Sequence, residues 1–282
     1  MPVNEWKEQY IDPRTDFGFD FLFGTSMNKE LLIGFLNAIF HGTHIIKDII
    51  YLNSVHYGIF DVHCETESGK KFIVEMQNAF QQFFEDRSAY YSSFPIYEQA
   101  KRGDWDYRLE SVYTVGILNF VFDEDKNSKD YFHHEVKLID VNTKKVFYDK
   151  LTFIYLELPK FTKTEHELET LFEKWVFVLK NLSRLLERPA ALQERVFNRL
   201  FEAASIARFT PKQLREYEDS VKAYRDIVNA VNTARKEGRE EGLEKRREEE
   251  RIGIAQNLKA MGIDMPAIQN ATSLTLEEIR KL

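Results

Sequence analysis

The sequence has one cysteine and no apolar run long enough to cross a membrane. Cys64 alone cannot form an internal disulfide, and a chain without a disulfide framework fits a reducing cytoplasm. A membrane span needs roughly eighteen consecutive apolar residues, and the N-terminus lacks the basic-then-apolar pattern of a secretion signal. We therefore expect a cytoplasmic protein with no membrane partner, in which Cys64 is a small buried hydrophobic side chain.

The chain also lacks an excess of positive charge. Its formal net charge of −7 argues against a broadly basic nucleic-acid-binding protein. A nuclease is not excluded, because a local basic groove and a bound metal can hold a phosphate while the remaining surface is acidic. With 282 residues, of which 43% are hydrophobic, the chain can bury a substantial core, and we expect one main domain with an appendage.

Residues 56–77 have the pattern of a β-hairpin, since apolar and polar side chains alternate in both halves. A three-residue loop, Glu67–Gly69, with the glycine in the left-handed conformation, would pair Thr66 with Lys70. A two-residue loop would shift the pairing by one residue and turn the side chains of one strand to the opposite face. We favour the three-residue loop because it gives each face of the hairpin a consistent character.

This register predicts that two carboxylates meet. It sets Asp61 opposite Glu75 with Cβ atoms roughly 5 Å apart, whereas the shorter loop would set Asp61 opposite Met76. Opposed carboxylates repel unless a cation lies between them, and hard ions such as Mg²⁺ take oxygen ligands. The alternative is that both point to solvent, but Glu75 lies at the end of an apolar run, where a solvated charge is not expected. We predict a metal site with Asp61 and Glu75 as ligands.

Asp61, thirteen intervening residues and then Glu75-Met76-Gln77 resemble the PD-(D/E)xK nuclease motif, in the variant with glutamine in place of lysine. The surrounding sequence resembles the family of recombination-promoting nucleases, or PD-(D/E)xK nuclease family transposases. The stretches that carry this resemblance are DFGFDFLFG (16–24), NKELLIGFLNAIF (28–40), VEMQ (74–77), DRSAYY (86–91) and VYTVGILNF (112–120).

The resemblance implies a fold and an activity. The fold would be α/β, with a restriction-endonuclease-like mixed sheet flanked by helices and a helical C-terminal extension. The activity would be metal-dependent hydrolysis of DNA phosphodiester bonds with Mg²⁺ or Mn²⁺, linked to recombination or mobile elements. DNA would be the partner, and a homo-oligomer is compatible with this class.

The resemblance also suggests roles for residues around the two carboxylates. Asp16 would help complete the metal site, although it could instead cap a short helix. Gln77 would position water or phosphate by hydrogen bonding without proton chemistry. Arg87 would anchor a substrate phosphate or a site carboxylate, unless it is an ion-paired or snorkelling surface side chain. Asp20 stands where relatives commonly have a lysine, which leaves that contribution unfilled.

The remaining pattern predicts the order of the elements. We expect strands at 47–53, 110–122, 132–140 and 146–158, a helix at 81–94 that Pro95 ends or kinks, and three amphipathic helical segments after residue 164. The predicted organisation is a nuclease-like domain (1–234), a charged helical linker (235–251) and a small helix-turn-helix-like tail (252–282). The alternative function is a catalytically weak or inactive member that binds DNA or a protein.

Overall fold

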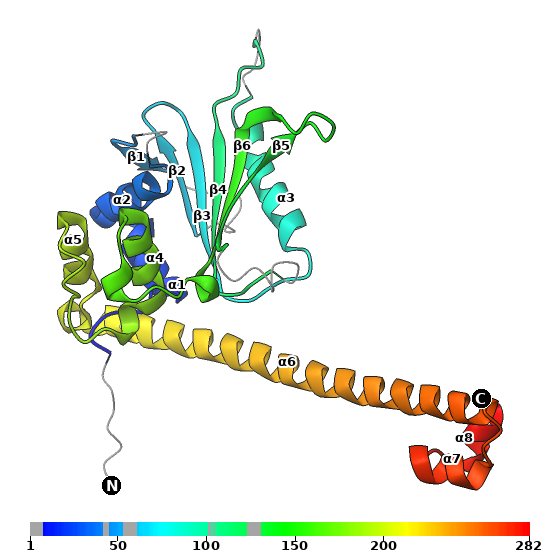
Figure 1. Ribbon diagram of the computed structural model, residues 1–282. Helices are drawn as coiled ribbons and strands as arrows, with labels where there is room; N and C mark the ends of the chain where they lie inside the picture. The colour runs from blue at the N-terminus through cyan, green and yellow to red at the C-terminus, as the bar shows by residue number, and fades with distance from the viewer. Residues whose placement is uncertain (1–7, 42–44, 53–60, 101–102, 104, 123–130) are drawn as a thin grey trace, which may run out of the picture. The chain divides into compact units, whose positions relative to one another are not determined.

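The computed structural model describes residues 8–41, 45–52, 61–100, 103, 105–122 and 131–282 (Figure 1). Contacts between Cα atoms divide the chain into two compact units, Met1–Ile227 and Val228–Leu282. The expected division at residues 234 and 251 stays a prediction. None of the helices in the described ranges combines the length and apolarity required to cross a membrane.

The first unit is built on a six-stranded mixed sheet with the order β1-β2-β3-β4-β6-β5 (Figure 1). The strands are β1 (Ile49–Tyr51), β2 (Val62–Thr66), β3 (Lys71–Gln77), β4 (Val112–Leu118), β5 (His133–Ile139) and β6 (Val146–Glu157). The central strands pair in parallel, β3 with β4 and β4 with β6. The outer pairs, β1 with β2, β2 with β3 and β5 with β6, are antiparallel. Every residue of β4 is buried, as expected for a central strand covered on both faces. The mixed α/β class is therefore confirmed.

The helices of the first unit are α1 (Asp16–Phe19), α2 (Lys29–Ile39), α3 (Phe84–Tyr97), α4 (Leu171–Asn181), α5 (Arg195–Ala204) and the start of α6 (Pro211–Ala260). A π-helical turn, η1 (Asp20–Gly24), continues α1. The main core lies on the face of the sheet that carries Phe72, Val74 and Met76, where residues of α2, α4 and α5 pack. α3 covers the other face through a smaller cluster around Phe84 and Tyr155. Cys64 is buried and free, as predicted.

Asn28 precedes α2, and its side chain makes no cap hydrogen bond but donates from Nδ2 to the carbonyl oxygen of Phe21 at 2.8 Å. One expectation about the helices needs correction. α3 contains Pro95 and extends two residues beyond it, to Tyr97. A proline close to the helix end removes one backbone donor, which is a smaller loss than in a helix centre.

The second unit contains the end of α6, α7 (Met265–Thr272) and α8 (Leu276–Lys281). Gly262, two residues after the end of α6, has a positive φ of 77°, a conformation that glycine favours at helix ends. Thr275 and Glu278 form a capping box at the start of α8. A small core of its own holds this unit together, made of Ala255, Ile268, Leu274 and Ile279.

Candidate active site

The β2–β3 hairpin has the register that the three-residue loop predicts. The Thr66 amide donates to the Lys70 carbonyl oxygen at 2.9 Å, and Gly69 has a φ of 81°. Val62 pairs with Val74, so that Asp61, the residue before β2, lies opposite Glu75. The register with a two-residue loop is excluded.

Glu75 lies on the α3 face of the sheet in a row with Gly116 of β4 and Tyr155 of β6. Gly116 has no side chain, and a Cβ atom placed there would lie only 2.9 Å from Cδ1 of Tyr155. The Tyr155 ring therefore fills the space above β4 beside Glu75. Burial raises the pKa of the Tyr155 hydroxyl to about 12, and the negative charge of Glu75 adds to this increase. Glu75 therefore lies beside the Tyr155 ring and is largely shielded from water.

Glu75 is 6% exposed, and its partners satisfy it only in part. Its Oε2 atom accepts a hydrogen bond from Nε2 of Gln77 at 3.1 Å and lies 3.5 Å from the Arg87 guanidinium. Its buried Oε1 atom has no hydrogen-bond partner among the described residues. Burial raises the pKa of Glu75 to about 7; Asp61 adds to the increase, while Arg87 and Gln77 oppose it. The negative charge of Glu75 is therefore undercompensated.

Asp61 is exposed as a residue, but its carboxylate is partly removed from water. Its Oδ2 atom accepts a hydrogen bond from the Met76 amide at 2.7 Å, which holds the carboxylate against β3. Desolvation is the largest cause that raises the pKa of Asp61 to about 6, and the charges of Asp16 and Asp20 add to it. The Met76 amide and Arg87 act in the opposite direction.

Asp16 lies in α1, and Asp20 begins the π-helical turn η1 that follows it. The helix is capped by Thr15, whose side chain accepts from the Gly18 amide at 3.0 Å, so that Asp16 lies in the first turn and is not the cap. Burial raises the pKa of Asp20. Because both carboxylates act on the pKa of Asp61, α1 and η1 bring further negative charge to the hairpin.

Arg87 supplies a positive charge from α3. Besides its ion pair with Glu75, it donates from Nη1 to Oε1 of Gln81 at 2.7 Å, and its guanidinium lies 5.1 Å from the centre of the Tyr91 ring. Its side chain is 25% exposed, so part of the guanidinium remains accessible. An ion pair was expected for Arg87 in either placement, and its partner is Glu75; a role of Arg87 in substrate binding stays a prediction.

Asparagines that the sequence analysis did not single out hold the end of β3. The Asn119 amide donates to the Gln77 carbonyl oxygen at 2.8 Å, and Nδ2 of Asn119 donates to the Tyr224 hydroxyl at 3.0 Å. Nδ2 of Asn78 donates to the Arg14 carbonyl oxygen at 2.7 Å. An asparagine directly after each of two parallel strands is the signal that could have identified this support.

The ligand set available for a metal is small. The described residues contain no group of three or more histidine, cysteine, aspartate or glutamate side chains placed to hold one ion. Two carboxylates are enough for a hard divalent ion, because Mg²⁺ usually keeps several waters and takes phosphate oxygens from its substrate. The oxygen donors of Asp61 and Glu75, with the unpartnered Oε1 atom, fit such an ion.

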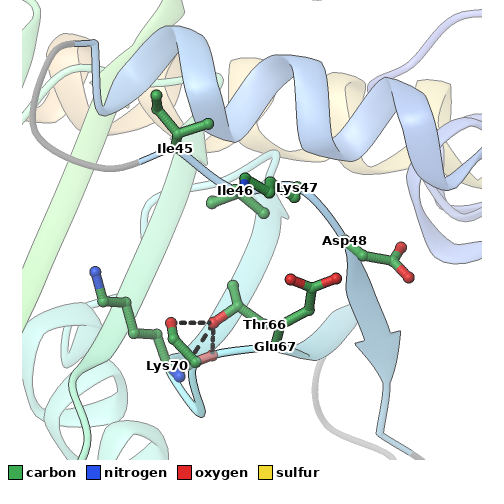
Figure 2. Close-up of a pocket in the computed structure, with 8 residues that line it drawn as sticks. Ile45, Ile46, Lys47, Asp48, Thr66, Glu67 and Lys70 are labelled. Atoms are coloured by element: carbon green, nitrogen blue, oxygen red, sulfur yellow. Dashed lines mark hydrogen bonds between the residues drawn. The ribbon is translucent and has the colours of Figure 1, made fainter.

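A separate pocket of about 190 Å³ lies at the other end of β3, beside the hairpin loop (Figure 2). Figure 2 shows Ile46, Lys47 and Asp48 on one side of it and the hairpin residues Thr66, Glu67 and Lys70 on the other. The hydroxyl of Thr66 accepts a hydrogen bond from the Lys70 amide at 3.2 Å. None of the residues expected in the metal and substrate site lines this pocket: Asp16, Asp61, Glu75, Gln77 and Arg87.

Comparison with known proteins identifies the family. Residues 13–234 match the family model described as PD-(D/E)XK nuclease family transposase. The comparisons with curated proteins and with solved structures gave no match. The matched range contains both hairpin carboxylates, Gln77, Asp16 and Arg87, and it ends before the small C-terminal unit's core residues.

Proposed function

Because the chain belongs to the PD-(D/E)XK nuclease family transposases, we propose that it is a metal-dependent DNA endonuclease whose ion is held by Asp61 and Glu75. The family supports nuclease activity. The observation that carries the proposal is the Glu75 carboxylate, which is buried beside Asp61 and has one oxygen atom without a hydrogen-bond partner in the described part of the chain. A buried carboxylate with unused acceptor capacity is costly for the fold unless a ligand completes it.

Mg²⁺ or Mn²⁺ is the ion that we propose for this pair. When bound, such an ion activates water and stabilises the charge that develops on a phosphate. It also lowers the repulsion between Asp61 and Glu75, because both carboxylates then face a cation.

Asp61 and Glu75 must both be ionised to act as ligands. Their pKa values of about 6 and about 7 mean that protons compete with the ion in mildly acidic solution. Cleavage should therefore increase as the pH rises from about 5 to about 8. The Met76 amide and the Gln77 amide group fix the orientation of the two carboxylates before a ligand arrives.

In the commoner motif a lysine supplies both a hydrogen-bond donor and a positive charge. Here we assign the donor to Gln77 and the charge to Arg87. Gln77 can orient a water or a phosphate oxygen but carries no charge. Arg87 carries the charge, and its guanidinium can bind a phosphate oxygen while it remains beside Glu75. We propose that Arg87 contacts the DNA backbone at the cleaved position and that the negative charge of Asp16, which already acts on Asp61, would help to hold the ion.

A second candidate function rests on a specific observation. Gln77 already donates to Glu75, and no lysine stands at the motif position. A chain with these residues could bind DNA or a partner protein without cutting DNA. The two functions differ in whether a divalent ion produces cleaved DNA.

The test is cleavage of a supercoiled plasmid by the purified full-length chain. Nicked or linear product should form with Mg²⁺ or Mn²⁺ and should not form with EDTA. Asp61→Asn and Glu75→Gln should each lower the rate by about a thousandfold or more, which corresponds to about 4 kcal/mol of transition-state stabilisation. Glu67→Gln, an exposed glutamate at the opposite end of β3, is the matched control and should cut at the wild-type rate.

Absence of cleavage with either ion, in a protein that still binds the plasmid, would overturn the endonuclease proposal in favour of the binding function. Equal cleavage by wild type and both site variants would indicate that the reaction uses other residues.

A further inference from the structure

The outer edge of β5 is open in the described part of the chain. β5 is the last strand of the sheet, and among the described strands it pairs with β6 alone (Figure 1). Exposed apolar side chains surround this edge on the β5–β6 hairpin: Val136, Leu138, Ile139, Val141, Val146 and Phe147. An edge strand of this kind presents unpaired backbone groups beside apolar surface, which is a template for pairing with another strand.

The direction of the backbone groups on β5 follows from one hydrogen bond. The Glu157 amide donates to the Phe132 carbonyl oxygen at 2.9 Å, so the backbone groups of Phe132 point toward β6. Along an antiparallel strand this direction alternates, and the register with β6 is regular as far as Lys137. The amide and carbonyl groups of Glu135 and Lys137 therefore point away from the sheet, whereas those of Val136 point toward β6.

We propose that a second copy of this chain pairs with β5 in an antiparallel arrangement, with the two-fold axis at Val136. This axis places Glu135 of each copy opposite Lys137 of the other. Both residues have outward-facing backbone groups, so the two resulting pairs are hydrogen-bonded pairs. Val136 meets Val136 of the second copy at a non-hydrogen-bonded position, where side chains approach most closely.

Charge selects this register over its neighbours. A two-fold axis at Glu135 or at Lys137 would set like charges directly opposite each other, which is destabilising. With the axis at Val136, both cross-strand charge pairs are of opposite sign. Within one chain, Nζ of Lys137 lies 2.5 Å from Oε1 of Glu135, so both charges lie on the same face of the strand, ready for cross-strand pairing. Charges on edge strands usually oppose association, but here their alternation is self-complementary.

The first experiment measures the mass of the full-length chain in solution by sedimentation velocity and light scattering. Wild type should have twice the monomer mass of 33.4 kDa. Glu135→Lys sets like charges opposite each other in the pair and should shift the population to monomer, with affinity reduced by tenfold or more. The charge swap Glu135→Lys with Lys137→Glu restores both opposite-charge pairs and should restore the dimer.

The second experiment tests the pairing by disulfide cross-linking. The single natural cysteine, Cys64, is buried, so a cysteine introduced on β5 would be the accessible thiol. Two facing Cα atoms at a non-hydrogen-bonded pair lie about 4.5 Å apart, within the range that a disulfide spans. Val136→Cys should therefore form a covalent dimer under mild oxidation. Val141→Cys is the control, since Val141 is 69% exposed but lies beyond the paired segment.

Circular dichroism and thermal melts confirm folding of each variant, and the charge swap keeps the pair within each chain. A monomeric wild type at all accessible concentrations would overturn the proposal. So would a dimer whose mass is unchanged by Glu135→Lys, because association would then use another surface. Equal cross-linking of Val136→Cys and Val141→Cys would exclude the two-fold axis at Val136. None of these outcomes depends on DNA cleavage.

Discussion

Two buried glutamates on the same face of the sheet differ in how fully hydrogen bonds and ion pairs engage their carboxylate oxygen atoms. Glu157 of β6 is 0% exposed and Glu75 of β3 is 6% exposed. Glu157 accepts from the Phe122 amide at 2.6 Å, lies 3.0 Å from Nε2 of His134 and lies 2.5 Å from Nζ of Lys160. Within the ranges that the structure describes, Glu75 has one amide donor, one longer contact to a guanidinium and one oxygen atom without a partner.

The difference distinguishes a carboxylate that groups of its own chain satisfy from the carboxylate that we propose as a metal ligand. Glu157 has both oxygen atoms engaged by groups of its own chain, so it ties the end of β6 to the segments around it. Glu75 keeps acceptor capacity that none of the described residues uses. Burial is similar in the two positions, and only the count of partners distinguishes them.

The largest expected effect on stability is at Glu157. Glu157→Ala leaves Lys160 and His134 beside an empty position, and removal of one partner from a buried ion pair costs about 3–5 kcal/mol. Glu75→Ala should cost far less, since it removes a poorly compensated charge. Chemical denaturation of both variants measures the two values. Equal losses would remove the distinction between the two glutamates.

The second effect is the pH dependence of stability at Glu75. Burial raises its pKa from 4.5 to about 7, so the folded state holds this proton more tightly than the unfolded state does. The stability associated with the proton is present below about pH 4.5 and is lost as the pH rises through about 7. Glu75→Gln has no proton to lose and should be more stable than wild type by up to about 3 kcal/mol near pH 8.

Denaturation at a series of pH values tests this sign, with Glu67→Gln as the exposed control. The advantage of Glu75→Gln should disappear near pH 4.5. A variant that is less stable than wild type at pH 8 would show that the ionised Glu75 has partners beyond those described.

The hairpin register could be predicted from the sequence because it depends on local geometry. Gly69 allows the left-handed residue that a three-residue loop needs, and the loop length then determines which residues face each other. The polar alternation on both sides of the loop also made the position of Asp61 opposite Glu75 predictable. Helix capping at Thr275 is local in the same sense.

The surroundings of Glu75 could not be predicted, because they depend on contacts between distant segments. Gly116 and Tyr155 join Glu75 only through the parallel pairing of β3, β4 and β6. A sequence pattern identifies each strand but not its neighbour or its register in a parallel pair. The partners of Glu157 were missed for the same reason, since His134 and Phe122 belong to other segments.

The third effect is stabilisation by metal. Without an ion, Asp61→Ala relieves repulsion with Glu75 and should leave the protein as stable as wild type or slightly more stable. With Mg²⁺ or Mn²⁺, wild type should gain about 1.4–2.7 kcal/mol when the ion is at ten to a hundred times its dissociation constant. The variant should gain almost nothing, because it lacks one of the proposed ligands.

Thermal melts with EDTA and with each ion measure the metal-induced rise in melting temperature of wild type and variant. Glu157→Gln is the control, because it tests whether a buried carboxylate outside the proposed site changes that rise. The same metal-induced shift in wild type, Asp61→Ala and Glu75→Ala would remove the two hairpin carboxylates from the metal site.

The smallest expected effect is at Gln77, which lies in the same row of the sheet as Leu118 and Glu157. Gln77→Lys exchanges an amide donor to Glu75 for a charged donor, so it should stabilise the ionised carboxylate and place a cation near the cleaved phosphate. We expect cleavage to be retained or increased, within about tenfold of wild type. The pH at which activity reaches half its maximum should fall, because the added cation lowers the pKa of Glu75.

Plasmid cleavage across a pH series measures both changes, with Gln77→Met as the uncharged variant that cannot donate. Complete loss of cleavage by Gln77→Lys, with an unchanged melting temperature, would show that the amide makes a specific contact that a charged donor cannot replace.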